Sequence, residues 1–233
     1  MKAILFHHVG GDRYAFRNVQ EWLLPEFENL TYELPGRSDR FKEPLLKSMA
    51  HMVLDAYEHT QKGMEQPFFF IGMSLGGLIA WQLAYFLKAQ KLPLPAFIFM
   101  ASRKCPQSYI NQPHASELPS DEFWKYVLKY GGCPPQLVEH KELREFYEPI
   151  LKADFAAAES HADQFQKPEP LDIPAGIYYG EKDERNFTEA DASGWAPYFT
   201  RFFEYKKFPG GHFFLYEDPA CIRHIKEIVL HAG

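Results

Sequence analysis

One serine of the chain stands in a setting that could make it a nucleophile. Ser74 lies between Gly72 and Gly76 in the stretch Gly-Met-Ser-Leu-Gly, which fits the pattern G-x-S-x-G. In this pattern a sharp strand-to-helix turn exposes the serine hydroxyl at the end of a sheet, and the glycines leave room for the turn. A serine hydroxyl is a weak nucleophile at neutral pH, so it needs a base that is oriented by an acid. The pattern therefore predicts a serine nucleophile and directs the search to a histidine and a carboxylate.

Among the ten histidines, His212 has the setting expected of the base. It follows two glycines in a loop between a predicted strand and the last predicted helix, where ligands and catalytic groups of open α/β sheets gather. In this architecture the acid comes between the serine and the histidine in the chain. Asp183, three residues after a strand that ends at Gly180, fits that order best. The competing acids are Glu181, Glu184 and Asp191.

Two backbone amides are expected to form an oxyanion hole. One is the N–H of Leu75, which follows the serine, and the other comes from the loop after an early strand. That loop is His-His-Val-Gly-Gly at residues 7–11, and we expect Val9 to be the donor, with His8 as the alternative. The adjacent histidines point to opposite faces of a strand, so they are not expected to bind a metal together. The reaction needs no cofactor, and none is predicted.

The elements around these residues alternate between strand and helix. Compact apolar runs predict strands at 2–7, 29–34, 68–72, 96–101, 175–180 and 201–208. Apolar residues at helical spacing predict helices at about 16–25, 45–59, 75–88 and 219–230. This alternation predicts a mostly parallel sheet with helices on both faces. It stops at about 103–170, which we expect to be a helical insertion that acts as a lid, with helices at 121–130, 136–139, 141–152 and 155–165.

Composition and charge exclude several kinds of partner. Residues 66–87 carry no charge and are long enough to span a bilayer, but Pro67 and the glycines near their middle divide them into a strand and a helix. A net charge of −6 argues against nucleic acid, which calls for a basic patch. The three cysteines show no metal or redox spacing, and the N-terminus lacks the pattern of a signal peptide. We therefore expect a monomeric, single-domain, cytoplasmic protein of 233 residues.

Several short motifs occur in an order that is typical of one enzyme family. They are Gly10-Gly11 after the first strand, Leu34-Pro35-Gly36-Arg37 after the second, the Ser74 pattern, Gly180-x-x-Asp183, and Gly210-Gly211-His212-Phe213-Phe214. Together they resemble the type II thioesterases that accompany nonribosomal peptide and polyketide synthases. The resemblance covers nearly the whole chain. The Leu-Pro-Gly-Arg element is its more specific part, because G-x-S-x-G is shared by many hydrolases.

The resemblance implies an α/β-hydrolase fold with a helical lid. It also implies hydrolysis of acyl groups from the phosphopantetheine arm of acyl- or peptidyl-carrier proteins, which clears stalled or mis-primed synthases. Ser74, Asp183 and His212 match the family's triad, and Val9 and Leu75 match its oxyanion donors. The chain departs from the family in the first loop, where proline and an aromatic residue usually precede Ala-Gly-Gly.

The insertion is expected to hold the acyl pocket and part of the carrier contact. Its aromatic residues either line that pocket or pack the lid onto the sheet: Phe123, Trp124, Tyr126, Tyr130, Phe146 and Tyr147. Because the family's carriers and this chain are both acidic, attraction needs a local basic patch, for which Arg103-Lys104 is the candidate. The alternatives are a general carboxylesterase or lipase, an acyl-CoA thioesterase with the same triad, and a binding protein without turnover.

Overall fold

The computed structural model describes the chain except residues 130–138, 184–185, 202 and 233. Within the described residues, the centre is a six-stranded sheet in the order β2-β1-β3-β4-β5-β6, and every neighbouring pair is parallel. The strands are β1 (Lys2–Phe6), β2 (Glu28–Tyr32), β3 (Phe68–Met73), β4 (Ile98–Ala101), β5 (Ala175–Gly180) and β6 (Phe203–Phe208). The chain runs outward from β1 to β2 and then from β3 to β6, so the strand order reverses between β1 and β3. Open sheets of this kind bind ligands at the carboxyl ends of the strands near such a reversal.

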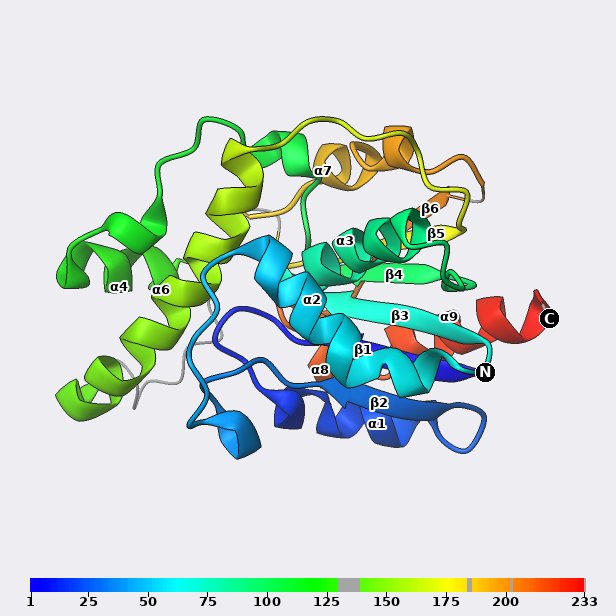
Figure 1. The fold of residues 1–233 in the computed structure, drawn as a ribbon, viewed down its shortest axis with the longest axis horizontal. Helices are drawn as coiled ribbons and strands as arrows, with labels where there is room; N and C mark the ends of the chain where they lie inside the picture. The colour runs from blue at the N-terminus through cyan, green and yellow to red at the C-terminus, as the bar shows by residue number, and fades with distance from the viewer. Residues whose placement is uncertain (130–138, 184–185, 202, 233) are drawn as a thin grey trace.

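Helices cover both faces of the sheet, as the sequence predicts (Figure 1). On one face lie α2 (Met49–Thr60) and α3 (Leu75–Ala89), and on the other α1 (Arg17–Leu23) and α9 (Ala220–His231). Successive strand side chains enter opposite cores, so Phe70 packs with α2 and α3 whereas Phe69 packs with α1 and α9. A strand that is covered on both faces must be apolar throughout. This explains the uncharged stretch through β3 and α3, and no described helix is long and apolar enough to cross a membrane.

Several boundaries differ from those expected. The first helix is preceded by a 3-10 turn, and α2 begins at Met49 rather than near residue 45. Leu45 is apolar for another reason, because it packs on the turn after β2, where a Cβ at Gly36 would lie 2.3 Å from its Cδ2 atom. A short helix, α8 (Phe214–Glu217), is present where none was expected, and α7 (Glu189–Ser193) opens with a capping box between Thr188 and Asp191. The 3-10 turns are Arg13–Phe16, Ser38–Arg40, Gln61–Met64, Pro106–Tyr109, Ala115–Glu117 and Ala196–Tyr198.

The largest difference lies between β4 and β5. The prediction of separate helices at 141–152 and 155–165 is wrong, because a single helix, α6, runs from Lys141 to Asp163 with Pro149 inside it. The polar residue near the expected break, Asp154, is fully buried. Its partners lie in other parts of the chain and hold the helix in place. The predicted helix at 121–130 is α4 (Ser120–Leu128), and the one at 136–139 lies outside the described residues except for Glu139.

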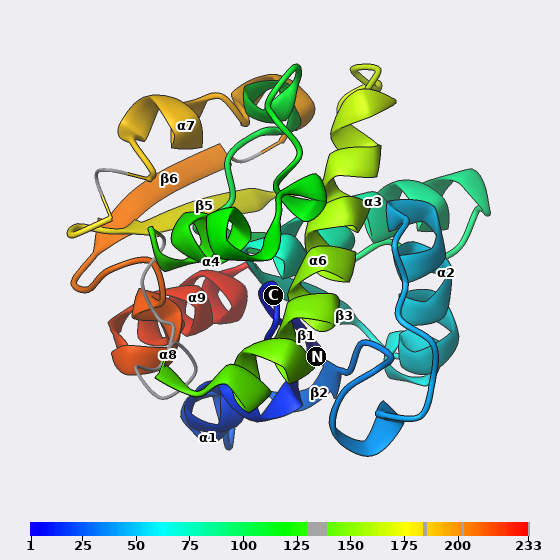
Figure 2. The same ribbon diagram turned by 90° about the vertical axis from the view of Figure 1, so that its left-hand side faces the viewer.

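Helices α4 and α6 lie beyond the carboxyl ends of the strands (Figure 1), and Figure 2 views the molecule from their side. In that view α6 crosses in front of the sheet, with α4 beside it. The loops that follow β1, β3, β4 and β5 open at the same end of the sheet, because all these strands are parallel. The helical segment therefore covers the edge at which the expected site residues meet.

Candidate active site

Ser74 lies in the turn between β3 and α3, in a conformation that few side chains adopt. Its φ is 52° and its ψ is −111°. A non-glycine residue held in such a region costs about 1–3 kcal/mol and persists only where its surroundings fix it. Here the Ser74 N–H donates a 2.8 Å hydrogen bond to the Ala101 carbonyl at the end of β4. The sheet thus holds the turn in its strained form.

The two glycines of the serine pattern are required by close backbone contacts. A Cβ at Gly72 would lie 2.4 Å from the Gly76 carbonyl oxygen, and one at Gly76 would lie 1.9 Å from the Phe6 carbonyl oxygen. Neither position accepts a larger residue unless backbone moves. The first turn of α3 therefore packs against the end of β1, which brings the loop after β1 beside Ser74.

His212 and Asp183 form a hydrogen-bonded pair at the end of β5. The distance between His212 Nδ1 and Asp183 Oδ2 is 2.8 Å, and the two side chains are 10% and 2% exposed. The other oxygen of Asp183 accepts a hydrogen bond of 2.9 Å from the side-chain amide of Asn186. Because a carboxylate oxygen accepts hydrogen bonds, Nδ1 of His212 is the donor in this pair.

The competing acids are placed differently. Asp191 accepts hydrogen bonds from Thr188 in the capping box and lies 3.3 Å from the Lys104 ammonium. Glu181 is exposed, and Glu184 lies outside the described residues. Among the acids that the structure describes, Asp183 is the one that contacts His212.

Ser74 and His212 line the same cavity, of about 520 Å³, between the sheet and the helical segment. Val9 and His8 also line it, from the loop after β1, and Leu151 lines it from α6. Leu75 is the first residue of α3, and N–H groups in the first turn of a helix have no acceptor within that helix. The predicted nucleophile, base and first-loop oxyanion donor thus line one cavity, and the other predicted donor, Leu75, directly follows Ser74.

A buried ion pair fixes the loop after β1 to α6. The Arg37 guanidinium binds the Asp154 carboxylate through two bonds of 2.8 Å, and the two side chains are 6% and 0% exposed. Asp154 also accepts the Gly10 N–H at 2.8 Å, and Arg37 donates to the Gly11 carbonyl at 3.1 Å. Burial, the largest single cause, lowers the pKa of Arg37, but the attraction and hydrogen bonding of Asp154, together with attraction by Glu33 and Tyr32, outweigh it and the pKa is raised. We did not expect this role for the arginine of the Leu-Pro-Gly-Arg motif.

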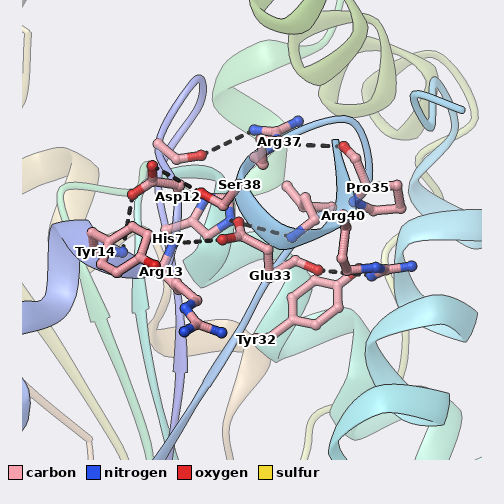
Figure 3. Close-up of polar contacts among 12 residues, drawn as sticks. His7, Asp12, Arg13, Tyr14, Tyr32, Glu33, Pro35, Arg37, Ser38 and Arg40 are labelled. Atoms are coloured by element: carbon pink, nitrogen blue, oxygen red, sulfur yellow. Dashed lines mark hydrogen bonds and ion pairs between the residues drawn. The ribbon is translucent and has the colours of Figure 1, made fainter. Parts of the chain in front are cut away.

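The turn after β2 reaches the loop after β1 at a second point. Figure 3 shows Arg37 between Pro35 and Ser38, and the Ser38 hydroxyl donates to Asp12 at 3.1 Å. Asp12 belongs to the loop after β1. The signal that could have identified Asp154 is a single acid among small apolar residues, in the stretch Ala-Asp-Phe-Ala-Ala-Ala of α6.

His8 forms part of the cavity wall as a neutral ring. Burial, and then repulsion by His7 and His212, lowers the pKa of His8 to about 3. Its Nδ1 atom lies 2.9 Å from the Tyr216 hydroxyl, and its ring packs edge-on against Phe213. His7 is buried in the opposite direction, with Nε2 3.3 Å from a Glu33 oxygen (Figure 3). Within the described part of the chain, no group of three His, Cys, Asp or Glu side chains is placed to hold a metal ion.

The aromatic residues of the helical segment mostly pack within that segment. Phe123 and Trp124 form a small core with Leu151, against which Tyr126 and Tyr147 pack, and Tyr126 also lines the cavity. Phe146 is 56% exposed. Tyr130 lies outside the described residues.

The expected basic patch at 103–104 is wrong in one respect. Arg103 is only 5% exposed and faces the cavity rather than the surface. It lies at the end of β4, where the Trp195 indole donates to its carbonyl at 2.7 Å. The residue type predicts the positive charge of Arg103, but the neighbouring residues in the sequence do not predict that its side chain is buried.

Comparisons with known proteins agree with this architecture. The model of the thioesterase domain family matches residues 2–229. The chain is 30% identical over 230 residues to the protein named linear gramicidin dehydrogenase LgrE of Brevibacillus parabrevis. The alignment covers 97% of this chain and 86% of LgrE. The chain is 28% identical over 232 residues to the human medium-chain S-acyl fatty acid synthase thioesterase, covering 98% and 86% of the two chains.

A solved structure supports the same fold. RedJ, a thioesterase from the prodiginine biosynthetic pathway in Streptomyces coelicolor, matches with a TM-score of 0.85 and 27% identity. The match covers 98% of this chain and 89% of RedJ. The expected α/β-hydrolase fold is confirmed.

Proposed function

The chain belongs to the thioesterase domain family and is a thioester hydrolase, and we propose a catalytic triad for it. In this proposal Ser74 is the nucleophile, His212 is the base, and Asp183 is the acid that orients the base. The observation that supports this proposal is geometric. A serine in a strained turn lines the same cavity as a histidine whose Nδ1 atom is bound 2.8 Å from a buried carboxylate. In the proposed mechanism the other ring nitrogen, Nε2, takes the proton of the serine hydroxyl.

The proposed reaction has two halves. Ser74 Oγ attacks the thioester carbonyl carbon while its proton passes to His212 Nε2. The carbon–sulfur bond then breaks, and the sulfur leaves as a thiol with the proton from His212, so that the acyl group is esterified to Ser74. Water attacks this ester as His212 takes its proton. The proton returns to Ser74 Oγ as the carboxylic acid is released.

The negative charge on the carbonyl oxygen is stabilised by backbone amides in this proposal. The N–H of Leu75 and that of Val9 are the donors, with His8 as the alternative to Val9. Removing one such donor typically lowers kcat about 10²–10³-fold. The Gly10 N–H donates to Asp154 and Arg37 donates to the Gly11 carbonyl, and these two hydrogen bonds fix the backbone just after Val9. Asp154 and Arg37 therefore position the second oxyanion donor.

The proposed substrates are acyl groups on the phosphopantetheine arm of carrier proteins, with an editing role in secondary-metabolite biosynthesis. In support, one relative is named as an S-acyl fatty acid synthase thioesterase and another as a thioesterase from the prodiginine biosynthetic pathway. Helices α4 and α6 serve as the lid over the acyl group. We expect the enzyme to act as a cytoplasmic monomer. Its described cysteines, Cys105 and Cys221, are free and buried.

The test uses a panel of acyl-loaded carrier proteins and follows their intact mass. The enzyme should remove the acyl group, and Ser74→Ala should remain folded by circular dichroism but lose turnover. Ser193→Ala, at the end of α7 outside the cavity lining, is the matched control and should behave like the wild type. Rapid cleavage of simple esters without carrier unloading would identify a general esterase. Preference for acyl-coenzyme A over every carrier would identify an acyl-CoA thioesterase, and no turnover of any substrate would indicate a binding protein.

A further inference from the structure

Arg103 is a buried cation in the wall of the cavity that Ser74 lines. The residue is 5% exposed, and its Nε atom has no hydrogen-bond partner. In the part of the chain that the structure describes, its guanidinium makes no hydrogen bond or ion pair with any residue. Buried arginines are ordinarily paired with a carboxylate, because a desolvated charge without a partner is costly.

The neighbouring acids that the structure describes make no ion pair with Arg103. Glu159 also lines the cavity, but its carboxylate accepts the N–H groups of Ala115 and Ser116 and the Ser116 hydroxyl. Asp191 is bound by Thr188 and Lys104. Arg103 thus lines the cavity without a carboxylate partner, and its charge is the second cause, after burial, that lowers the pKa of His161, on α6, to about 4.

The guanidinium contacts an aromatic ring that needs none of its N–H donors. The Arg103 Cζ atom lies 4.2 Å from the centre of the Tyr109 ring, which is the distance of a cation–π contact. Such a contact restrains the group and leaves its N–H donors unused. A guanidinium held in this way is prepared for a planar group with two oxygens, which it binds through parallel hydrogen bonds.

Arg103 also lies close to the serine turn. A Cβ at Gly77, in the first turn of α3, would be 3.3 Å from the Arg103 Cβ. The Ala101 carbonyl, two residues before Arg103, accepts the Ser74 N–H. An acyl group on Ser74 and the Arg103 side chain would thus occupy one cavity.

We propose that Arg103 binds a carboxylate at the far end of the acyl group, so that this enzyme favours acyl thioesters of dicarboxylic acids. The inference rests on the proposed function of Ser74, because it assigns the substrate of that serine. The phosphate of a phosphopantetheine arm is another source of negative charge. The buried position of Arg103 beside the serine favours the acyl end, since the phosphate lies at the opposite end of the arm from the thioester.

The test compares acyl groups of equal length on N-acetylcysteamine, which carries no phosphate. Glutaryl and pentanoyl thioesters differ in one terminal carboxylate. The wild type should have the higher kcat/KM for the glutaryl thioester. In Arg103→Met the ratio of the two kcat/KM values should fall about tenfold or more, mainly through KM, because a hydrogen-bonded charge pair is lost. Arg103→Lys should retain part of the preference, as it keeps the charge without the two-pronged geometry.

Arg144→Met is the matched control. Arg144, on α6, also has an Nε atom without a partner, but it is not among the residues that line the cavity. Its substitution should leave the ratio unchanged. A measurement without any variant guards against misfolding: free glutarate should inhibit the wild type more strongly than pentanoate.

The outcomes separate the two levels of the proposal. Hydrolysis of both thioesters with the same ratio in the wild type and Arg103→Met, or equal inhibition by the two acids, would overturn the role of Arg103 and leave the thioesterase function intact. A loss in Arg103→Met that is confined to carrier-linked substrates, neutral acyl groups included, would assign Arg103 to the arm phosphate and also overturn it. Failure of the wild type to hydrolyse any thioester would overturn the proposed function itself.

Discussion

Arg37 and Arg103 are buried to nearly the same extent at the carboxyl end of one sheet, yet their donors are used in opposite ways. Arg37 is 6% exposed and binds the Asp154 carboxylate through two bonds as well as the Gly11 carbonyl. Arg103 is 5% exposed and contacts the Tyr109 ring. Burial alone therefore does not distinguish an arginine that holds protein segments together from one that we propose to bind the substrate. The difference is whether the guanidinium N–H groups are hydrogen-bonded to other residues of the protein.

The two arginines also differ in what offsets the cost of burial. For Arg37 the compensating charge is part of the protein and joins three segments, the turn after β2, the loop after β1 and α6. For Arg103 our proposal assigns the compensating charge to the carboxylate of a bound acyl group. We therefore expect disruption around Arg37 to affect stability and kcat, and disruption at Arg103 to affect substrate preference.

The largest effect is expected from Asp154→Asn, which leaves Arg37 buried beside a neutral partner. Breaking a buried ion pair in this way typically costs about 3–5 kcal/mol of unfolding free energy. Urea unfolding at neutral pH measures the loss. Asp39→Asn is the matched control, because Asp39 pairs with Arg13 at 2.7 Å where the side chains are 45% and 63% exposed, and exposed pairs contribute about 1 kcal/mol or less. Equal losses in the two variants would contradict the structural role of the Arg37–Asp154 pair.

A double variant separates stability from catalysis. Arg37→Met with Asp154→Leu removes both charges, and such replacements are often neutral or stabilising. The unfolding free energy should recover toward the wild-type value, but the acceptor of the Gly10 N–H is lost. We expect kcat to stay lower, by up to about 10²-fold, with a smaller change in KM, since one oxyanion donor is less well positioned. A stable double variant with wild-type kcat would show that the pair has no role in positioning the loop.

The smallest effect is expected at His161, which reports on the charge of Arg103. Burial is the main cause that lowers the pKa of His161 to about 4, and Arg103 is the second. In Arg103→Met the pKa should rise part of the way toward 6.5, as measured by NMR titration of the ring. An unchanged pKa would mean that the charge of Arg103 is already neutralised.

The same shift has a consequence for stability. The unfolded chain takes up a proton at His161 near pH 6.5, whereas the folded protein resists it down to about pH 4. Stability that is present above pH 6.5 is therefore lost as the pH falls toward 4. In Arg103→Met the contribution of His161 to this loss should be smaller, which unfolding at pH 7 and pH 5 measures. His161→Gln removes the contribution and is the reference.

Features that depend on local patterns can be predicted from the sequence, whereas contacts between distant segments cannot. The sheet, the order of its elements and the placement of Ser74, Asp183 and His212 at strand ends follow from local patterns and chain order. The catalytic roles of these three residues remain predictions. The pairing of Arg37 with Asp154 joins residues 117 positions apart, and no local pattern links them.

The residues whose environment the sequence does not predict are also those that contact distant segments of the chain. Asp154 resembles a surface residue at a helix break, and Arg103 with Lys104 resembles a surface patch. In both cases the side chain is buried by a segment distant in the sequence, so its environment becomes visible only in the folded chain. The boundary of α2 was misplaced for a related reason, because Leu45 is apolar in order to pack on Gly36 rather than to face a helix core.

Our proposal requires that Ser74 carries the acyl group during turnover. The most direct measurement mixes the enzyme with an acyl-loaded carrier protein, stops the reaction with acid within the first turnover, and determines the mass of the peptide that contains Ser74. This peptide should gain the mass of the acyl group and lose it as free acid appears. Release of the acid at full rate by Ser74→Ala, or an acyl group on a different residue, would rule out Ser74 as the nucleophile.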